Sequence, residues 1–146
     1  MRVVRILAVD PGTTRLGLAL SDPTGTIASA LVTLPAEPVA TLVQRLAETA
    51  RAHEVTRIVV GLPIRMDGSR GPEASAAAKL ADDLRAATRV PVETLDERLT
   101  TAAAERLLIK AGMKREKRRQ TVDRVAATIL LQSYLDRMRS DKRRAG

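Results

Sequence analysis

Asp10 is the residue of this chain best placed to do chemistry, because it directly follows a run of apolar residues. Residues 3–9 are rich in β-branched side chains and predict a buried strand. A carboxylate at the end of such a strand is costly to desolvate unless a metal or another cation binds it. Gly12, in the turn that follows, would let a phosphate or a second backbone approach closely. An Asx-turn that opens a β-hairpin is the alternative interpretation of Asp10.

Further acids stand at the ends of two other predicted elements. Asp96 and Glu97 follow a strand predicted over 90–95, and Asp123 lies one residue inside a helix predicted over 122–138. The carboxyl ends of parallel strands share one edge of a sheet, so Asp96 and Glu97 are expected near Asp10. Asp123 either joins them or only complements the helix dipole. Clustered carboxylates repel one another unless a divalent cation lies among them, and two-metal sites use such clusters to cleave phosphodiesters.

The predicted elements determine whether these acids can meet. Strands are predicted over 3–9, 16–22, 27–34, 57–62 and 90–95, and helices over 39–50, 73–87, 100–111 and 122–138. The first three strands should form an antiparallel meander, and the last two, each reached through a helix, should lie parallel to the first. This pattern predicts an α/β, ribonuclease H-like fold: a mixed five-stranded sheet of order 3-2-1-4-5, with strand 2 antiparallel, flanked by helices. A single domain over 1–138 and a basic, flexible tail over 139–146 are expected.

The composition restricts the chemistry. The chain has 146 residues, no cysteine and one histidine, which excludes zinc fingers, zinc hydrolases and thiolate catalysis. Any metal must therefore be held by oxygen ligands, which favours Mg²⁺ or Mn²⁺. The first residues show no signal-peptide pattern, and no apolar run is long enough to cross a membrane, so a cytoplasmic location is expected.

The positive charge is concentrated at one end of the chain. The net charge is +8; residues 1–109 carry 13 basic and 13 acidic side chains, whereas residues 110–146 carry 12 basic and 4 acidic ones. Such asymmetry is typical of a polyanion-binding region, although a solvated charge run that only confers solubility is the alternative. With one tyrosine and no Phe or Trp, the chain has no platform for stacking bases, so we expect contacts to the backbone of structured nucleic acid. The candidate phosphate contacts are Arg65 and Arg70, in a Gly/Pro loop before a helix, and Lys114, Arg115, Lys117, Arg118 and Arg119.

Four segments, which together span nearly the whole chain, resemble the YqgF/RuvX family of ribonuclease H-like nucleases related to Holliday junction resolvases. This resemblance implies metal-binding catalytic acids at Asp10, Glu97 and Asp123. It also implies that Asp96 could support the metal ligands without binding the metal. Arg98, which is next to these acids in the sequence, either contacts the scissile phosphate or pairs with Asp96. One departure from the family pattern, Ile64-Arg65, puts a substrate contact in doubt. The matching segments are Ala8–Thr13 with Leu16–Ala19, Ile58–Pro63 with Met66–Gly68, Asp96–Thr101, and Val122-Asp123 with Ala126-Ala127 and Leu130–Leu135.

The resemblance implies a divalent-metal-dependent endonuclease that hydrolyses phosphodiester bonds in structured nucleic acid. Its substrate would be either the 5′ end of the 16S ribosomal RNA precursor or a four-way DNA junction. A junction would favour a homodimer, because two symmetric cuts suit two-fold symmetry. Two other functions are considered: a catalytically silent nucleic-acid-binding protein, and a nucleotide-dependent phosphotransferase of the actin and sugar-kinase type. The latter needs a second phosphate-binding domain, for which the sequence has no counterpart to 10–14.

Overall fold

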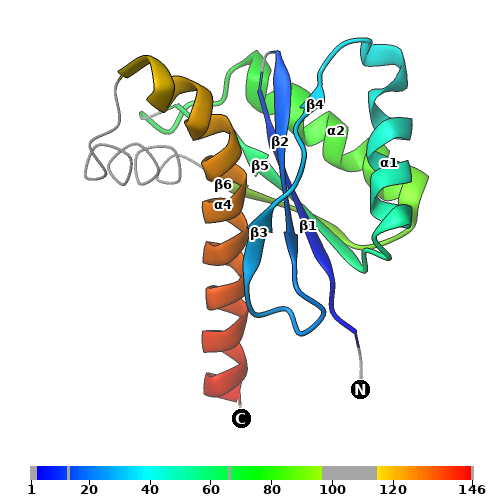
Figure 1. Ribbon diagram of the computed structural model, residues 1–146, viewed down its shortest axis with the longest axis vertical. Coiled ribbons are helices and arrows are strands. Elements are labelled where there is room, and N and C mark those ends of the chain that lie inside the picture. Colours follow the sequence, from blue (N-terminus) through cyan, green and yellow to red (C-terminus); the bar gives the residue numbers. More distant parts are fainter. Residues whose placement is uncertain (1–2, 13, 66, 97–114, 146) are drawn as a thin grey trace.

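The computed structural model describes residues 3–12, 14–65, 67–96 and 115–145, and in the last segment it describes the side chains of 125–141. Figure 1 shows a twisted sheet with helices on both faces. The elements are β1 (Ile6–Pro11), β2 (Arg15–Ser21), β3 (Ala28–Ala30), β4 (Leu34–Pro35), η1 (Val39–Thr41), α1 (Leu42–Ala52), β5 (Arg57–Leu62), α2 (Pro72–Thr88), β6 (Val92–Asp96) and α4 (Arg115–Ala145).

The sheet has the predicted order and directions. Its strands lie in the order β3-β2-β1-β5-β6; β2 is antiparallel to β1, whereas β5 and β6 continue the sheet in parallel. The strand predicted over 27–34 is instead two short strands, β3 and β4, which both pair with β2. Ala30 pairs with Ala19 but Leu34 pairs with Leu16, so four steps along one chain match three along the other. The extra residue interrupts the ladder as a β-bulge does.

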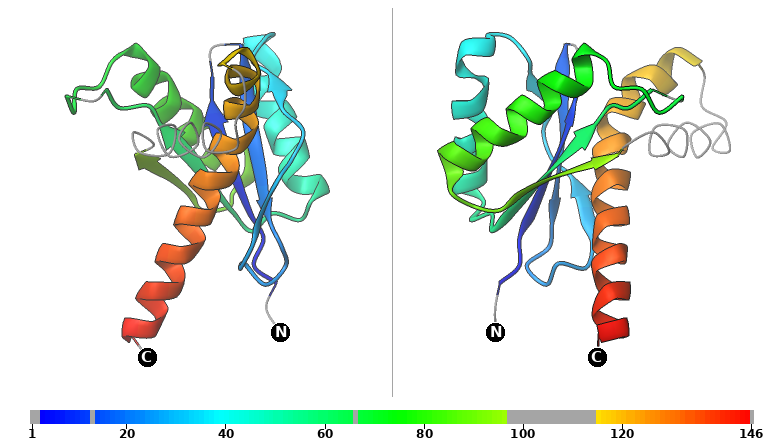
Figure 2. Two further views of the ribbon diagram at one scale, coloured as in Figure 1. Left: turned by 60° about the vertical axis from the view of Figure 1, so that its left-hand side comes forward. Right: turned by 180° about the vertical axis from the view of Figure 1, so that it is seen from behind.

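Each face of the sheet has its own apolar cluster, because alternate residues of a strand point to opposite faces. Leu7 and Val9 pack with α1 and α2, whereas Ile6 and Ala8 pack under α4. Figure 2 shows α4 on one face and α1 and α2 on the other. The α4 side of the second cluster is formed by Ala127, Leu130, Leu131, Tyr134 and Leu135.

The helix α4 is longer at both ends than the sequence predicts. It begins at Arg115, so the basic residues from Arg115 to Arg119 form its first turns instead of preceding it. It ends at Ala145 instead of near Met138. No Gly or Pro occurs between its ends, and Arg, Lys, Glu and Gln favour helix, which explains the extension. The flexibility expected for 139–146 stays a prediction.

The direction of α4 matters for the candidate site. It runs antiparallel to β1, and its first turns lie at the end of the molecule where β1 ends (Figure 1). Among the described helices, none is both long and apolar enough to cross a membrane.

Candidate acidic site at the carboxyl end of β1

Asp10 is half-buried near the end of β1, and glycines lie beside it on both neighbouring strands. It pairs with Gly17 of β2. On the other side Val9 pairs with Val60 of β5, and the next residue along β5 is Gly61. Both glycines are buried. The two strands that flank β1 therefore place no Cβ beside Asp10 in its row of the sheet.

The alternation of side chains places Asp10 on the α4 face. Ile6 and Ala8, which share its parity on β1, belong to the cluster under α4. The turn beyond it depends on Gly12, because a Cβ there would collide with the carbonyl oxygen of Arg15. Gly12 was predicted to allow a close approach, and the group that approaches it is the backbone carbonyl of Arg15.

The backbone of α4 brings position 123 to the level of Asp10. Gln132 of α4 bonds to Ala28 of β3, which pairs with Ser21 of β2, and the Ser21 hydroxyl accepts from the Ile6 N–H, so Gln132 lies near the level of Ile6. From Ile6 to Asp10 the strand rises by roughly 13 Å, and from Gln132 back to Asp123 the antiparallel helix rises by about 14 Å in the same direction. Asp123 is the ninth residue of α4, counted from Arg115, well beyond the first turn. The alternative role in complementing the helix dipole therefore does not apply, because that effect is confined to the helix end.

Asp96 shares the sheet edge with Asp10 but not its face. It is the exposed last residue of β6 and pairs with Leu62 of β5. Leu62 belongs to the cluster under α1 and α2, so the register directs Asp96 to that face. Asp10 and Asp96 are also separated by β5, the strand between them.

Other predicted site residues lie outside the described residues. These are Glu97, Arg98 and Lys114, together with the helix expected over 100–111. The side chains of Arg115, Lys117, Arg118, Arg119 and Asp123 are also outside them. Within the described part of the chain no three acidic or histidine side chains are grouped so that they could hold a metal ion. The side chains of Glu97 and Asp123 lie outside that part, so the triad of Asp10, Glu97 and Asp123 stays a prediction.

The Gly/Pro loop after β5 presents both of its predicted arginines to solvent. Arg65 and Arg70 are exposed. The loop is closed by two backbone hydrogen bonds: the Arg65 N–H donates to the Ser69 carbonyl over 3.0 Å, and the Gly68 N–H donates to the Arg65 carbonyl over 2.8 Å. Hydrogen bonds from the Ser69 side chain and backbone lower the pKa of Asp67. The Arg65 guanidinium lies near Gly71, the residue before α2.

Two polar connections between α4 and the sheet were not predicted from the sequence. The Arg57 guanidinium donates a 2.7 Å hydrogen bond to the Tyr134 hydroxyl and lies 3.5 Å from Glu93. The Tyr134 hydrogen bond raises the pKa of Arg57, and burial raises the pKa of Tyr134. These residues line a cavity of about 530 Å³. The other connection is made by Gln132, which contacts β3 and the turn before it. The sequence gives no signal for either, because the partners come from distant segments.

Comparison with known proteins decides the family. A family profile described as "RuvX: Holliday junction resolvase" matches residues 4–137. The chain belongs to this family. A protein from Roseiflexus named "Putative pre-16S rRNA nuclease" is 46% identical over 135 residues, which are 92% of this chain and 96% of the relative. A protein of the same name from Moorella thermoacetica is 47% identical over the same shares of the two chains.

Solved structures of similar fold agree with the sheet described above. Thermus thermophilus RuvC in complex with a Holliday junction substrate superposes with a TM-score of 0.56 at 19% identity, covering 92% of this chain and 96% of that one. The fowlpox virus Holliday junction resolvase gives a TM-score of 0.57 at 15% identity, covering 91% and 99%. At these identities the likeness establishes the ribonuclease H-like fold, as predicted from the order of elements.

Proposed function

We propose that this RuvX-family protein is a divalent-metal-dependent endonuclease that hydrolyses phosphodiester bonds in structured nucleic acid. The observation that carries the proposal is the setting of Asp10: a half-buried carboxylate, with glycines beside it on both neighbouring strands, at the level of position 123 of α4. The relatives, which match more than nine-tenths of this chain, are named as nucleases, and this supports the coarser statement that the protein is a nuclease.

The proposed metal ligands are Asp10, Glu97 and Asp123. Glu97 has the same parity along the chain as Glu93 and Leu95, and Leu95 packs against the cluster under α4. All three donors are carboxylate oxygens, which suit Mg²⁺ or Mn²⁺. Such an ion, when bound, lowers the pKa of a water molecule and stabilises the leaving oxygen.

The other proposed roles belong to basic residues that bind and orient the substrate backbone. Arg65 and Arg70 are exposed on the loop before α2 and are available to phosphates. Arg115, Lys117, Arg118 and Arg119 belong to the first turns of α4, which also carries Asp123, and Lys114 directly precedes them. Arg98, next to Glu97 in the sequence, is proposed to contact the scissile phosphate. These charges would hold the backbone without reading its sequence.

We propose the 5′ end of the 16S ribosomal RNA precursor as the first substrate to test, because relatives at 46–47% identity carry that name. A four-way DNA junction is the second, favoured by the description of the family profile. Both are structured polyanions, and the basic residues proposed above would contact the phosphate backbone of either.

The deciding experiment compares the two substrates side by side. A labelled precursor RNA fragment and a labelled four-way junction are incubated with the protein and Mg²⁺, and with the D10N variant as control. We expect site-specific cleavage of the RNA by the wild-type protein and none by D10N. Cleavage of the junction alone would assign the second substrate. Tight binding of both without cleavage would contradict the proposal and favour a catalytically silent binding protein.

A further inference from the structure

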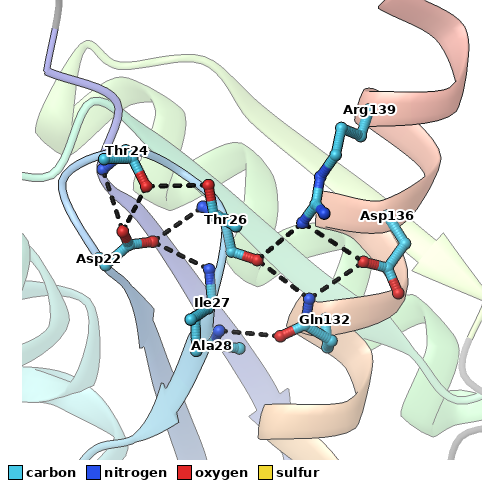
Figure 3. A network of polar contacts seen from close by, with 8 residues as sticks. All are labelled: Asp22, Thr24, Thr26, Ile27, Ala28, Gln132, Asp136 and Arg139. Carbon is cyan, nitrogen blue, oxygen red and sulfur yellow. Dashed lines mark hydrogen bonds and ion pairs between the residues drawn. The ribbon is translucent and has the colours of Figure 1, made fainter. Parts of the chain in front are cut away.

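A glutamine of α4 caps the outer edge of β3. The carbonyl of Ile27 and the N–H of Leu31 face β2, where they bond to Asp22 and Leu18. The alternate groups, the Thr26 carbonyl and the Ala28 N–H, therefore point away from β2. The Gln132 Oε1 accepts from the Ala28 N–H over 2.9 Å, and its Nε2 donates to the Thr26 carbonyl over 3.1 Å (Figure 3). One side-chain amide thus takes the place of the next strand.

Neighbouring charged residues hold that amide in one orientation. The Gln132 Nε2 also donates to Asp136, one turn later, over 3.0 Å. Arg139 donates to the Thr26 carbonyl over 2.9 Å and lies 3.7 Å from Asp136 (Figure 3). A flipped amide would set its NH₂ group against the Ala28 N–H and its oxygen against two acceptors. The contacts therefore determine which atom of the Gln132 amide faces each group at the edge of β3.

Tyr134 supplies a second anchor on the other side of the helix. Positions 132 and 134 are about 200° apart around a helix of 3.6 residues per turn. Gln132 reaches the β3 edge, whereas the Tyr134 hydroxyl accepts from Arg57 of β5. The large interface between α4 and the sheet that lies between these anchors is apolar. Apolar packing is not directional, so among the described side chains of α4 these two polar anchors add a directional constraint on its position on the sheet.

We propose that Gln132, with Tyr134 as the second anchor, is a positioning residue for the acidic site: by fixing the register of α4 it holds Asp123 at the level of Asp10. The inference rests on the proposed function. Gln132 follows Asp123 by nine residues, about 14 Å along the helix. A slip of α4 by one residue moves Asp123 by about 1.5 Å, whereas metal–ligand distances tolerate only about 0.2 Å.

The test measures metal binding to the free protein as well as cleavage. Mn²⁺ binding is followed by electron paramagnetic resonance, and the Mg²⁺ dependence of cleavage is measured in parallel. We expect Q132A to weaken Mn²⁺ binding about tenfold and to raise the half-saturating Mg²⁺ concentration similarly, as removal of a residue that supports the metal ligands does in other proteins. Cleavage at saturating Mg²⁺ should fall less. S133A, which changes the exposed neighbour, should match the wild type.

Y134F is the second variant, because it removes one hydroxyl and keeps the ring packing. We expect it to shift Mn²⁺ affinity in the same direction as Q132A but less. A Q132A protein with lower thermal stability and wild-type Mn²⁺ affinity would overturn the positioning role; if Q132A does not fold, unchanged affinity in Y134F would do so. Failure of the proposed function looks different: D10N would then bind Mn²⁺ as tightly as the wild type, or the wild type would not bind it.

Discussion

Asp10 and Asp22 have almost the same sequence context but different surroundings. Each is followed by Pro and then by Gly and Thr residues: Asp10-Pro11-Gly12-Thr13-Thr14 in one case and Asp22-Pro23-Thr24-Gly25-Thr26 in the other. Asp10 lies near the end of β1, whereas Asp22 directly follows β2. The two acids therefore belong to opposite ends of the same hairpin.

The carboxylate of Asp22 is stabilised as an anion by hydrogen bonds from its own turn. It accepts backbone hydrogen bonds from Thr26 over 2.8 Å, from Ile27 over 2.9 Å and from Thr24 over 3.4 Å, and a further bond from the Thr24 hydroxyl. The bond from the Ile27 N–H, with the others, holds the pKa of Asp22 well below its usual range. This acid is structural and requires no cation.

Asp10 lies inside the ladder instead of opening a turn. It pairs with Gly17, and Pro11 after it still pairs with Leu16, so the turn begins only beyond Pro11. The Asx-turn interpretation, which the sequence allowed for Asp10, describes Asp22. The same Asp-Pro pattern therefore closes a turn at Asp22 and lies inside the ladder at Asp10, and only Asp10 is proposed as a metal ligand.

The largest expected effect is the difference in cleavage rate between the D10N and D22N variants. D10N should lower the single-turnover cleavage rate by at least about a hundredfold, because a missing metal ligand removes several kcal/mol of transition-state stabilisation. E97Q and D123N should do the same, and all three should fold and bind substrate. D22N should have lower thermal stability but keep the wild-type cleavage rate. Near-wild-type cleavage by D10N, or loss of cleavage in D22N at a temperature where it is folded, would reverse the roles assigned to the two acids.

Changing the metal ion should affect the role of Asp10 and leave that of Asp22, at the other end of the hairpin, unchanged. Excess EDTA should abolish cleavage, Mg²⁺ or Mn²⁺ should restore it, and Ca²⁺ should support binding with little cleavage because it tolerates looser geometry. The thermal stability of D10N should respond to Mg²⁺ less than that of D22N, since only D22N keeps the complete ligand set. Differential scanning fluorimetry with and without Mg²⁺ measures this, and full activity in EDTA would refute metal catalysis.

The sequence predicts the sheet well because strands buried on both faces have a strong pattern. The order of β1, β2, β5 and β6 and their directions follow from short turns and helical crossovers. The predicted start of α4 was wrong because the basic residues before position 122 are themselves good helix formers. The face of Asp96 depends on its register with Leu62, and the partners of Gln132 are backbone groups more than a hundred residues away. Neither is encoded locally.

The basic first turns of α4 should have an intermediate effect. Neutralising Lys114, Arg115, Lys117, Arg118 and Arg119 to Gln should weaken binding to every nucleic acid tested. It should also flatten the salt dependence by about one unit of slope for each phosphate interaction that is removed. Cleavage at saturating substrate should fall less than affinity, because the acids remain. Fluorescence anisotropy at several salt concentrations measures the affinity and its salt dependence.

A matched pair of variants separates phosphate binding from general charge. Arg118→Gln with Arg119→Gln removes two charges from α4, and Arg51→Gln with Lys79→Gln removes two charges from α1 and α2, on the other face. Both pairs lower the net charge equally, so only the α4 pair should weaken nucleic-acid binding by more than this shared loss of charge explains. Equal reductions in affinity would show that the charge of α4 serves solubility and long-range attraction alone.

The smallest expected effect is the acid sensitivity contributed by Asp22. Because its folded pKa lies below the unfolded value of about 3.9, its carboxylate stabilises the fold fully above that pH. This contribution disappears as the pH falls through the folded pKa. The difference in Tm between wild type and D22N should therefore be largest near neutral pH and shrink below about pH 4. T24V, which removes the hydroxyl donor but keeps the backbone donors, should give an intermediate difference. A gap between wild type and D22N that stays constant down to pH 2 would show that the charge of Asp22 does not stabilise the turn.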